Sequence, residues 1–257
     1  MTRFGSIARF AALGALCILG TAARAEVPAN GPGYMDAAFA SVDTLIKASQ
    51  GKPTLPRLAD PVEGKVLEDV WNEAAILGKA PYAEADIPAL LAIVQKQTLI
   101  LKAYTLFSPD RKAPDTARNT VEFQDELTRT HVFLLKAVAA SLEAINSFGA
   151  HLKVEEKTEA RFQGIRQMRL GLQEIVAGAA LALRIPALRP ANQLLIARSL
   201  AENAAALAAG TAPPDRQALI AALQAAQPAL KPDAKKAISE FIQTVSAASC
   251  DGLCRLN

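Results

Sequence analysis

The 257-residue sequence has few of the residues on which most catalytic and metal centres depend. It contains two histidines and three cysteines, and aromatic residues make up only 5% of it. No HExxH, GxSxG, P-loop or GxGxxG motif is present, and neither histidine follows a glutamate by three residues, as di-iron bundles require. We therefore expect no metal and no cofactor, and the sequence points to no catalytic residues.

Residues that favour β-strands are also scarce. Ala and Leu dominate an apolar fraction of 51%, and both are strong helix formers. All fifteen prolines lie beyond residue 25, where they divide the chain into helix-sized segments, but none lies between Pro114 and Pro186. We therefore expect an all-α protein: an antiparallel helical bundle built around a long helical hairpin at about 115–185, with shorter flanking helices.

The first 25 residues have the pattern of a secretory signal peptide. Arg3 and Arg9 form a short basic start, residues 10–22 are apolar and small, and Ala23-Arg24-Ala25 suits a signal peptidase. We expect cleavage after Ala25, so that the mature chain is periplasmic or secreted.

Cleavage would change the charge of the chain. The full sequence has 28 Lys and Arg against 25 Asp and Glu, but three arginines and no acid lie in residues 1–25. The mature chain is therefore formally neutral, which gives no support for nucleic-acid binding. Its most apolar segments are short or interrupted by polar residues, so we expect no membrane span. We expect a flexible leader at 26–33 and a single all-helical domain at 34–257.

Proline, glycine and capping residues predict the limits of the individual helices. The expected helices lie at about 34–50, 61–78, 86–107, 115–148, 154–184, 190–209, 214–226 and 231–248. Residues 149–152 (GAHL) are expected to form the turn of the long hairpin.

Three glycines recur every seven residues in the second long helix of this hairpin. Gly164, Gly171 and Gly178 alternate with Met168, Ile175 and Ala182, a spacing that places all six on one helix face. We call this set the glycine seam. Each interior glycine costs about 1 kcal/mol relative to alanine, and close approach of another helix would offset that cost. The seam therefore predicts that this helix packs tightly at the centre of the bundle, and that Gly171→Leu is strongly destabilising. Self-association into a homodimer and a ligand groove are the alternatives.

The first long helix has a matching apolar face that contains a histidine. Its members are Leu127, His131, Leu134, Val138, Ser141, Ile145 and Phe148. We interpret His131 as a core residue. Its functional alternative is a pH-sensitive packing position, since a buried imidazole titrates near neutral pH.

Two cysteines remain after cleavage. Cys250 and Cys254 are four residues apart, which is within bridging distance on a helix or turn, and an exported chain meets oxidising conditions. We expect a local disulfide that holds the C-terminal segment. An intermolecular bridge and a redox or metal site are the alternatives.

Three functions fit these observations. The leading hypothesis is a non-enzymatic interaction or structural protein of the periplasm, which binds a protein partner through a face of the bundle. The second is a carrier of a small apolar or lipid-like ligand held between helices. The third is a carboxylate-based hydrolase of the cell envelope, which would need two acids with separated pKa values.

Overall fold

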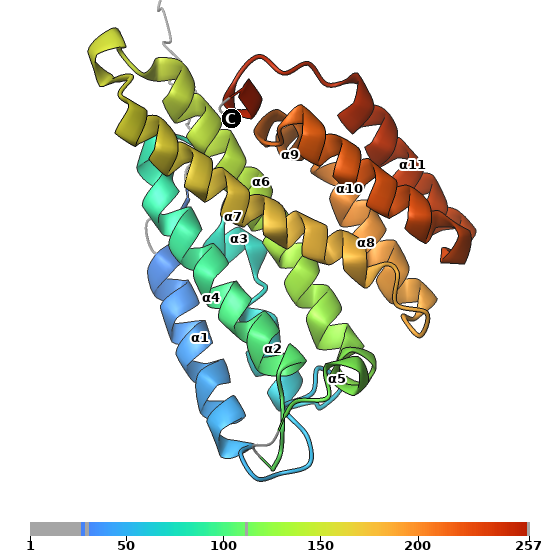
Figure 1. The fold of residues 1–257 in the computed structure, drawn as a ribbon. Helices are drawn as coiled ribbons and strands as arrows, with labels where there is room; N and C mark the ends of the chain where they lie inside the picture. The colour runs from blue at the N-terminus through green and yellow to red at the C-terminus, as the bar shows by residue number, and fades with distance from the viewer. Residues whose placement is uncertain (1–26, 29–30, 111–112, 256–257) are drawn as a thin grey trace, which may run out of the picture.

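The computed structural model describes residues 27–28, 31–110 and 113–255, and these residues form a bundle of eleven α-helices without a β-strand (Figure 1). The helices are α1 (Gly31–Ala48), α2 (Glu63–Asp69), α3 (Glu73–Ile76), α4 (Ile87–Thr105), α5 (Thr116–Glu122), α6 (Gln124–His151), α7 (Glu159–Ala182), α8 (Pro190–Glu202), α9 (Ala204–Gly210), α10 (Pro213–Ala226) and α11 (Pro232–Ala247). The expected all-α bundle is therefore confirmed. The expected signal peptide lies outside the described residues.

Helix α6 is the centre of the bundle. It packs against α4, α7, α8 and α9, and Leu134, Val138 and Ile145 of its expected apolar face are fully buried. By length and composition α6 could cross a membrane, but 61% of its most apolar stretch is buried by its neighbours, as in a core helix. The expectation that the second long helix would occupy the centre is wrong, because α7 lies on the outside of α6 (Figure 1).

The long hairpin is present with shifted boundaries. Phe123 separates α5 from α6, because its buried ring packs edge-on against Tyr104 and Phe107 at centroid distances of 5.4 and 5.7 Å. Helix α6 continues through the expected turn to His151. The true turn follows it and ends at Thr158, whose hydroxyl accepts a hydrogen bond from the Arg161 N–H and caps α7.

Two other expected helices are broken by asparagine. The helix expected at 61–78 is divided into α2 and α3, where the Asn72 side chain accepts a hydrogen bond from the Ala75 N–H. The helix expected at 190–209 is divided at Asn203, which separates α8 from α9. Asparagine competes for backbone hydrogen bonds, so such breaks are physically reasonable.

The C-terminal helices complete the bundle. Helices α8 and α9 pack on α6, α11 packs on α8 and α9, and α10 lies between α7 and α11. At the other end, the described part of the expected leader is packed, not free. Val27 is buried, with its N–H donating to Asp86 Oδ1, and α1 already begins at Gly31.

The segment that follows α11 is held by side chains from three helices. Arg216 of α10 donates to the carbonyl oxygens of Ala248 and Ser249, at 2.6 and 3.0 Å. Arg169 of α7 donates to the Leu253 carbonyl, and Asn146 of α6 accepts from the Leu253 N–H. We call residues 248–254 the C-terminal loop.

The expected disulfide closes this loop. Cys250 and Cys254 are joined, with their Cα atoms 5.6 Å apart. Leu253 and Cys254 are buried, at 3% and 1% exposure. The disulfide therefore joins a half-buried cysteine to the buried end of the loop.

The three glycines of the glycine seam do not pack against another helix. Gly164 and Gly171 are exposed, Gly178 is half-buried, and a Cβ added at any of the three would meet no atom within 4 Å. The buried face of α7 is instead the neighbouring stripe of Ile165, Arg169, Leu172, Val176, Ala179 and Leu183. The expected tight packing is therefore wrong for the described chain.

Substitution at Gly171 is accordingly expected to be harmless. Gly171→Ala should raise the free energy of unfolding by about 0.5–1 kcal/mol, because alanine has the higher helix propensity and space is available. Gly64→Ala should lower it by about 1–3 kcal/mol, because the new Cβ would collide with the Leu58 carbonyl oxygen. Chemical denaturation of both variants measures the difference, and destabilisation by Gly171→Ala would restore the packing interpretation.

Candidate functional site

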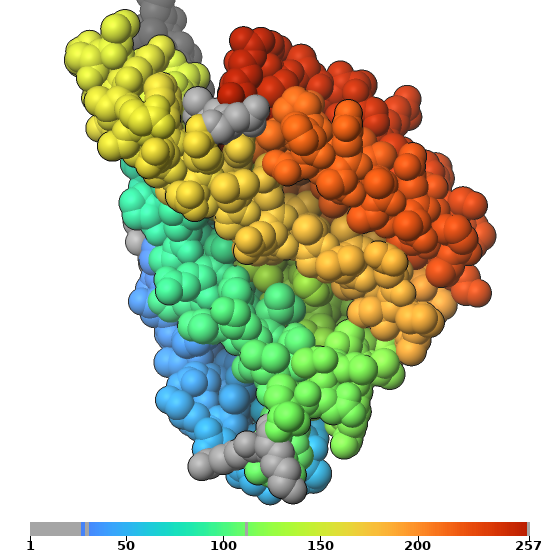
Figure 2. Space-filling view, viewed as in Figure 1, coloured from blue at the N-terminus to red at the C-terminus, as the bar shows by residue number. Residues whose placement is uncertain are grey.

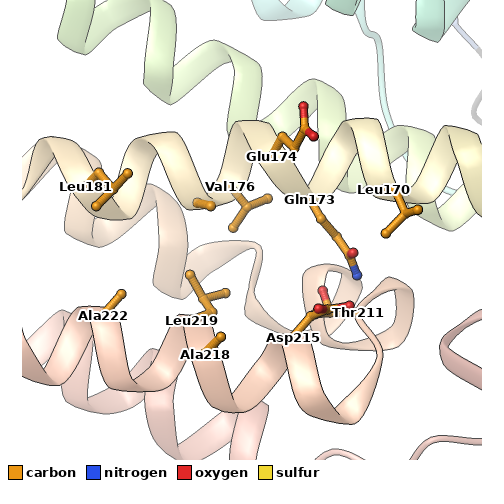
Figure 3. A pocket seen from close by; sticks show the side chains of 11 residues that line it. Leu170, Gln173, Glu174, Val176, Leu181, Thr211, Asp215, Ala218, Leu219 and Ala222 are labelled. Carbon is orange, nitrogen blue, oxygen red and sulfur yellow. The ribbon is translucent and has the colours of Figure 1, made fainter.

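A mainly apolar surface depression lies between α7 and α10. We call it the α7–α10 groove, and its volume is about 420 Å³. Figure 3 shows the two helices running side by side, with aliphatic side chains facing each other across the groove. Its lining residues are Leu170, Gln173, Glu174, Val176, Ala177, Leu181, Thr211, Asp215, Ala218, Leu219 and Ala222. The small alanines of α10 leave this space open, because they do not fill the distance between the two helices.

One end of the groove is polar. There the Gln173 side chain points toward Thr211 and Asp215 (Figure 3). The Gln173 amide donates to the Gly210 carbonyl at 3.4 Å, and the Thr211 hydroxyl donates to the Leu207 carbonyl at 2.6 Å. The Thr211 hydroxyl and one N–H of Gln173 are thus used within the protein, whereas the amide oxygen of Gln173 and the Asp215 carboxylate are available as acceptors. The Asp215 carboxylate also attracts the Arg169 guanidinium. No basic residue lines the groove.

A second cavity, of about 370 Å³, lies on the other flank of α7, and we call it the His131 cavity. Its lining residues are Leu101, Thr105, Thr120, Gln124, Leu127, Thr128, His131, Gly178, Leu181, Ala182, Ile185, Leu188 and Ile196. The structure thus brings together His131 and Gly178, two of the residues singled out from the sequence. Figure 2 shows atoms of α6 in the space between α4 and α7, behind the atoms of these two helices.

Four residues of the glycine seam, Gly164, Met168, Gly171 and Ile175, line neither cavity. Met168 and Ile175 are partly buried against the core, whereas Gly164 and Gly171 face outward. The glycine seam therefore contributes only its C-terminal end, Gly178 and Ala182, to a cavity wall.

His131 is an uncharged side chain at neutral pH. Burial lowers the pKa of its imidazole to about 4, because the charged form would lose its hydration. Its Nδ1 atom is buried and has no hydrogen-bond partner among the described residues. The imidazole therefore contributes a buried polar atom without a partner to the wall of this cavity.

The most buried carboxylate of the described chain has a structural role. Glu126, at 1% exposure, accepts a hydrogen bond from the Leu58 N–H at 2.7 Å and lies 3.4 Å from Arg57 Nε. These contacts hold the loop before α2 against α6. Among the described residues, no group of three His, Cys, Asp or Glu side chains is arranged to hold a metal ion.

Sequence reasoning missed the α7–α10 groove and the arginine contacts to the C-terminal loop. Ala218 and Ala222 of the groove resemble the many other alanines of the chain, so no local signal marks them. Comparisons with models of protein families, with curated proteins and with solved structures found no match for this chain.

Proposed function

We propose that this protein is a carrier of small amphipathic molecules, which it holds in the α7–α10 groove. The observation that supports this proposal is an apolar groove that ends in hydrogen-bond acceptors. Ligand sites in proteins are typically concave and mainly apolar, with a few polar groups that orient the ligand. Leu170 and Leu181, which flank the groove, are 37% and 53% exposed, so their apolar surface is available to a ligand.

The shape and charge of the groove indicate the class of ligand. On α7 the lining residues extend from Leu170 to Leu181, a distance of about 16 Å at 1.5 Å per residue, which suits an extended alkyl chain. At the polar end, Gln173 and Asp215 offer oxygen atoms and the groove contains no basic group. A hydroxyl or ammonium head group is therefore favoured over a carboxylate.

The setting we propose is the periplasm. The pattern of residues 1–25 supports export, and the disulfide between Cys250 and Cys254 suits an oxidising compartment. Export would separate such a carrier from the cytoplasm, so its ligand would be taken up from the periplasm or from an adjacent membrane.

Binding of two matched amphiphiles tests the proposal. The mature protein should bind dodecylammonium about fivefold more tightly than dodecanoate, both measured by calorimetry below their micelle concentrations. The Asp215 carboxylate attracts the ammonium group of the first probe and repels the carboxylate of the second. The difference in affinity is modest because Asp215 is exposed and water screens its charge. Asp215→Asn should bring the two affinities closer together.

Two further variants locate the binding. Ala222→Phe fills the groove and should abolish binding of dodecylammonium, whereas Ala221→Phe places the same ring on the adjacent exposed position and should have no effect. Equal binding by both variants would show that the amphiphile lies elsewhere and would refute the proposal. Native mass spectrometry of protein purified from its own cells would then identify the ligand as a non-covalent adduct.

A further inference from the structure

The His131 cavity differs in chemistry from the α7–α10 groove. Its lining contains aliphatic side chains from α4, α6, α7 and α8, together with threonines, Gln124 and the imidazole of His131. No other ionisable side chain is among its lining residues. A charged ligand would therefore lose its hydration without gaining a partner of opposite charge.

The size of this cavity is sufficient for an organic molecule. Its volume of about 370 Å³ exceeds the roughly 150 Å³ of an engineered protein cavity that takes up benzene. Gly178 leaves the side toward α7 open, because a Cβ at this position would have no neighbour within 4 Å. The walls come from five helices and from the loop between α7 and α8, so several packed elements define the shape of the cavity.

The polar atoms of the wall favour a ligand with one hydrogen-bonding group. A neutral imidazole has one donor and one acceptor nitrogen, and the buried Nδ1 atom of His131 has no hydrogen-bond partner among the described residues. Gln124 is already engaged, because its side-chain oxygen accepts from the Arg189 N–H at 2.8 Å and its amide donates to the Val121 carbonyl. His131 therefore offers unused hydrogen-bonding capacity in the wall of this cavity.

We propose that the His131 cavity is a second binding site, which takes an uncharged, mainly apolar molecule with a single hydroxyl or amide group that hydrogen-bonds to the His131 imidazole. The site goes beyond the proposed carrier function and does not depend on it. Leu181 is the one lining residue that the cavity shares with the α7–α10 groove.

Two probes of nearly equal shape test this proposal: 1-naphthol and 1-methylnaphthalene, which differ by a hydroxyl in place of a methyl group. Both should bind the full-length mature protein in fluorescence titrations. His131→Phe keeps an aromatic ring but removes the nitrogens. The affinity for 1-naphthol, relative to that for 1-methylnaphthalene, should therefore fall about fivefold. Gly178→Leu should abolish binding of both probes by filling the cavity. Gly171→Leu, one heptad earlier on an exposed face, is the matched control and should bind as the unmodified protein does.

Three results would overturn the proposal. They are failure of both probes to bind, an affinity ratio that His131→Phe leaves unchanged, and binding that survives Gly178→Leu but is lost in Ala222→Phe. The last result would place the probes in the α7–α10 groove. Circular dichroism verifies that each variant is folded. If Gly178→Leu is not folded, Ala182→Leu takes its place in the test, because it narrows the same cavity from the next turn of α7.

Discussion

Replacement of Arg216 by methionine is expected to lower the free energy of unfolding by about 3 kcal/mol. The Arg216 guanidinium is buried and donates to four carbonyl oxygens, those of Ala208, Thr211, Ala248 and Ser249. Methionine fills similar space but donates nothing, so carbonyl groups at the end of α9 and in the C-terminal loop lose their partners. Urea-induced unfolding followed by circular dichroism measures the loss.

Two other variants separate geometry from charge. Arg216→Lys keeps the charge but cannot reach four acceptors at once, so it should lose most of the same stability. Arg198→Met, an exposed arginine on α8, should change the stability by less than about 0.5 kcal/mol. If Arg216→Met were as stable as the unmodified protein, the desolvation of the guanidinium would outweigh its hydrogen bonds, as occurs with some buried charges.

Acidification is expected to destabilise the protein through His131. Its pKa is about 4 in the folded protein and about 6.5 in the unfolded chain, so the unfolded chain takes up the proton first as the pH falls. The stability is therefore complete above about pH 6.5, declines as the pH falls, and loses nothing more through this group below about pH 4. Between pH 7 and 4.5 the expected loss is about 2–3 kcal/mol, which urea unfolding at a series of pH values measures.

The variant His131→Phe identifies the source of this pH dependence. It should be insensitive to pH over most of the same range, because none of the other residues that line the His131 cavity is ionisable. Carboxylates such as Asp125, whose pKa is lowered by hydrogen bonds from Asn192 and Arg189 despite its partial burial, act mainly at lower pH. A slope that persists in His131→Phe between pH 6.5 and 4.5 would assign the effect to other groups.

The outline of the fold could be predicted because helix limits depend on local chemistry. Prolines, glycines and capping residues act within a few positions of themselves, so the long hairpin and most helix ends are near their expected places. The helix ends that were predicted wrongly lie where contacts between residues far apart in the sequence determine the end of a helix. Phe123 ends a helix because Tyr104 and Phe107 hold its ring, and those contacts join separate helices.

The candidate sites show a different limit of sequence reasoning. Periodicity shows that residues share a helix face but not which way that face points, and α7 has two such faces. The glycine seam is the more regular of the two, yet Leu172 and Val176 of the other face are buried. Arginines are usually surface residues, so no pattern in the sequence indicates that Arg169 and Arg216 would lie in the core.

The attachment of the C-terminal loop determines when the protein can reach its final structure during synthesis. The helices that hold it are made first, but Asn146, Arg169 and Arg216 acquire their partners in the loop only when residues 248–254 have emerged. Until then the Arg169 guanidinium lacks its carbonyl partner in the loop, and Arg216 donates only to the carbonyls of Ala208 and Thr211. Both guanidinium groups are therefore less completely hydrogen-bonded within the protein at that stage. The C-terminal loop therefore completes the hydrogen bonds of side chains on three earlier helices, so these parts of the core reach their final packing only after the loop has been made.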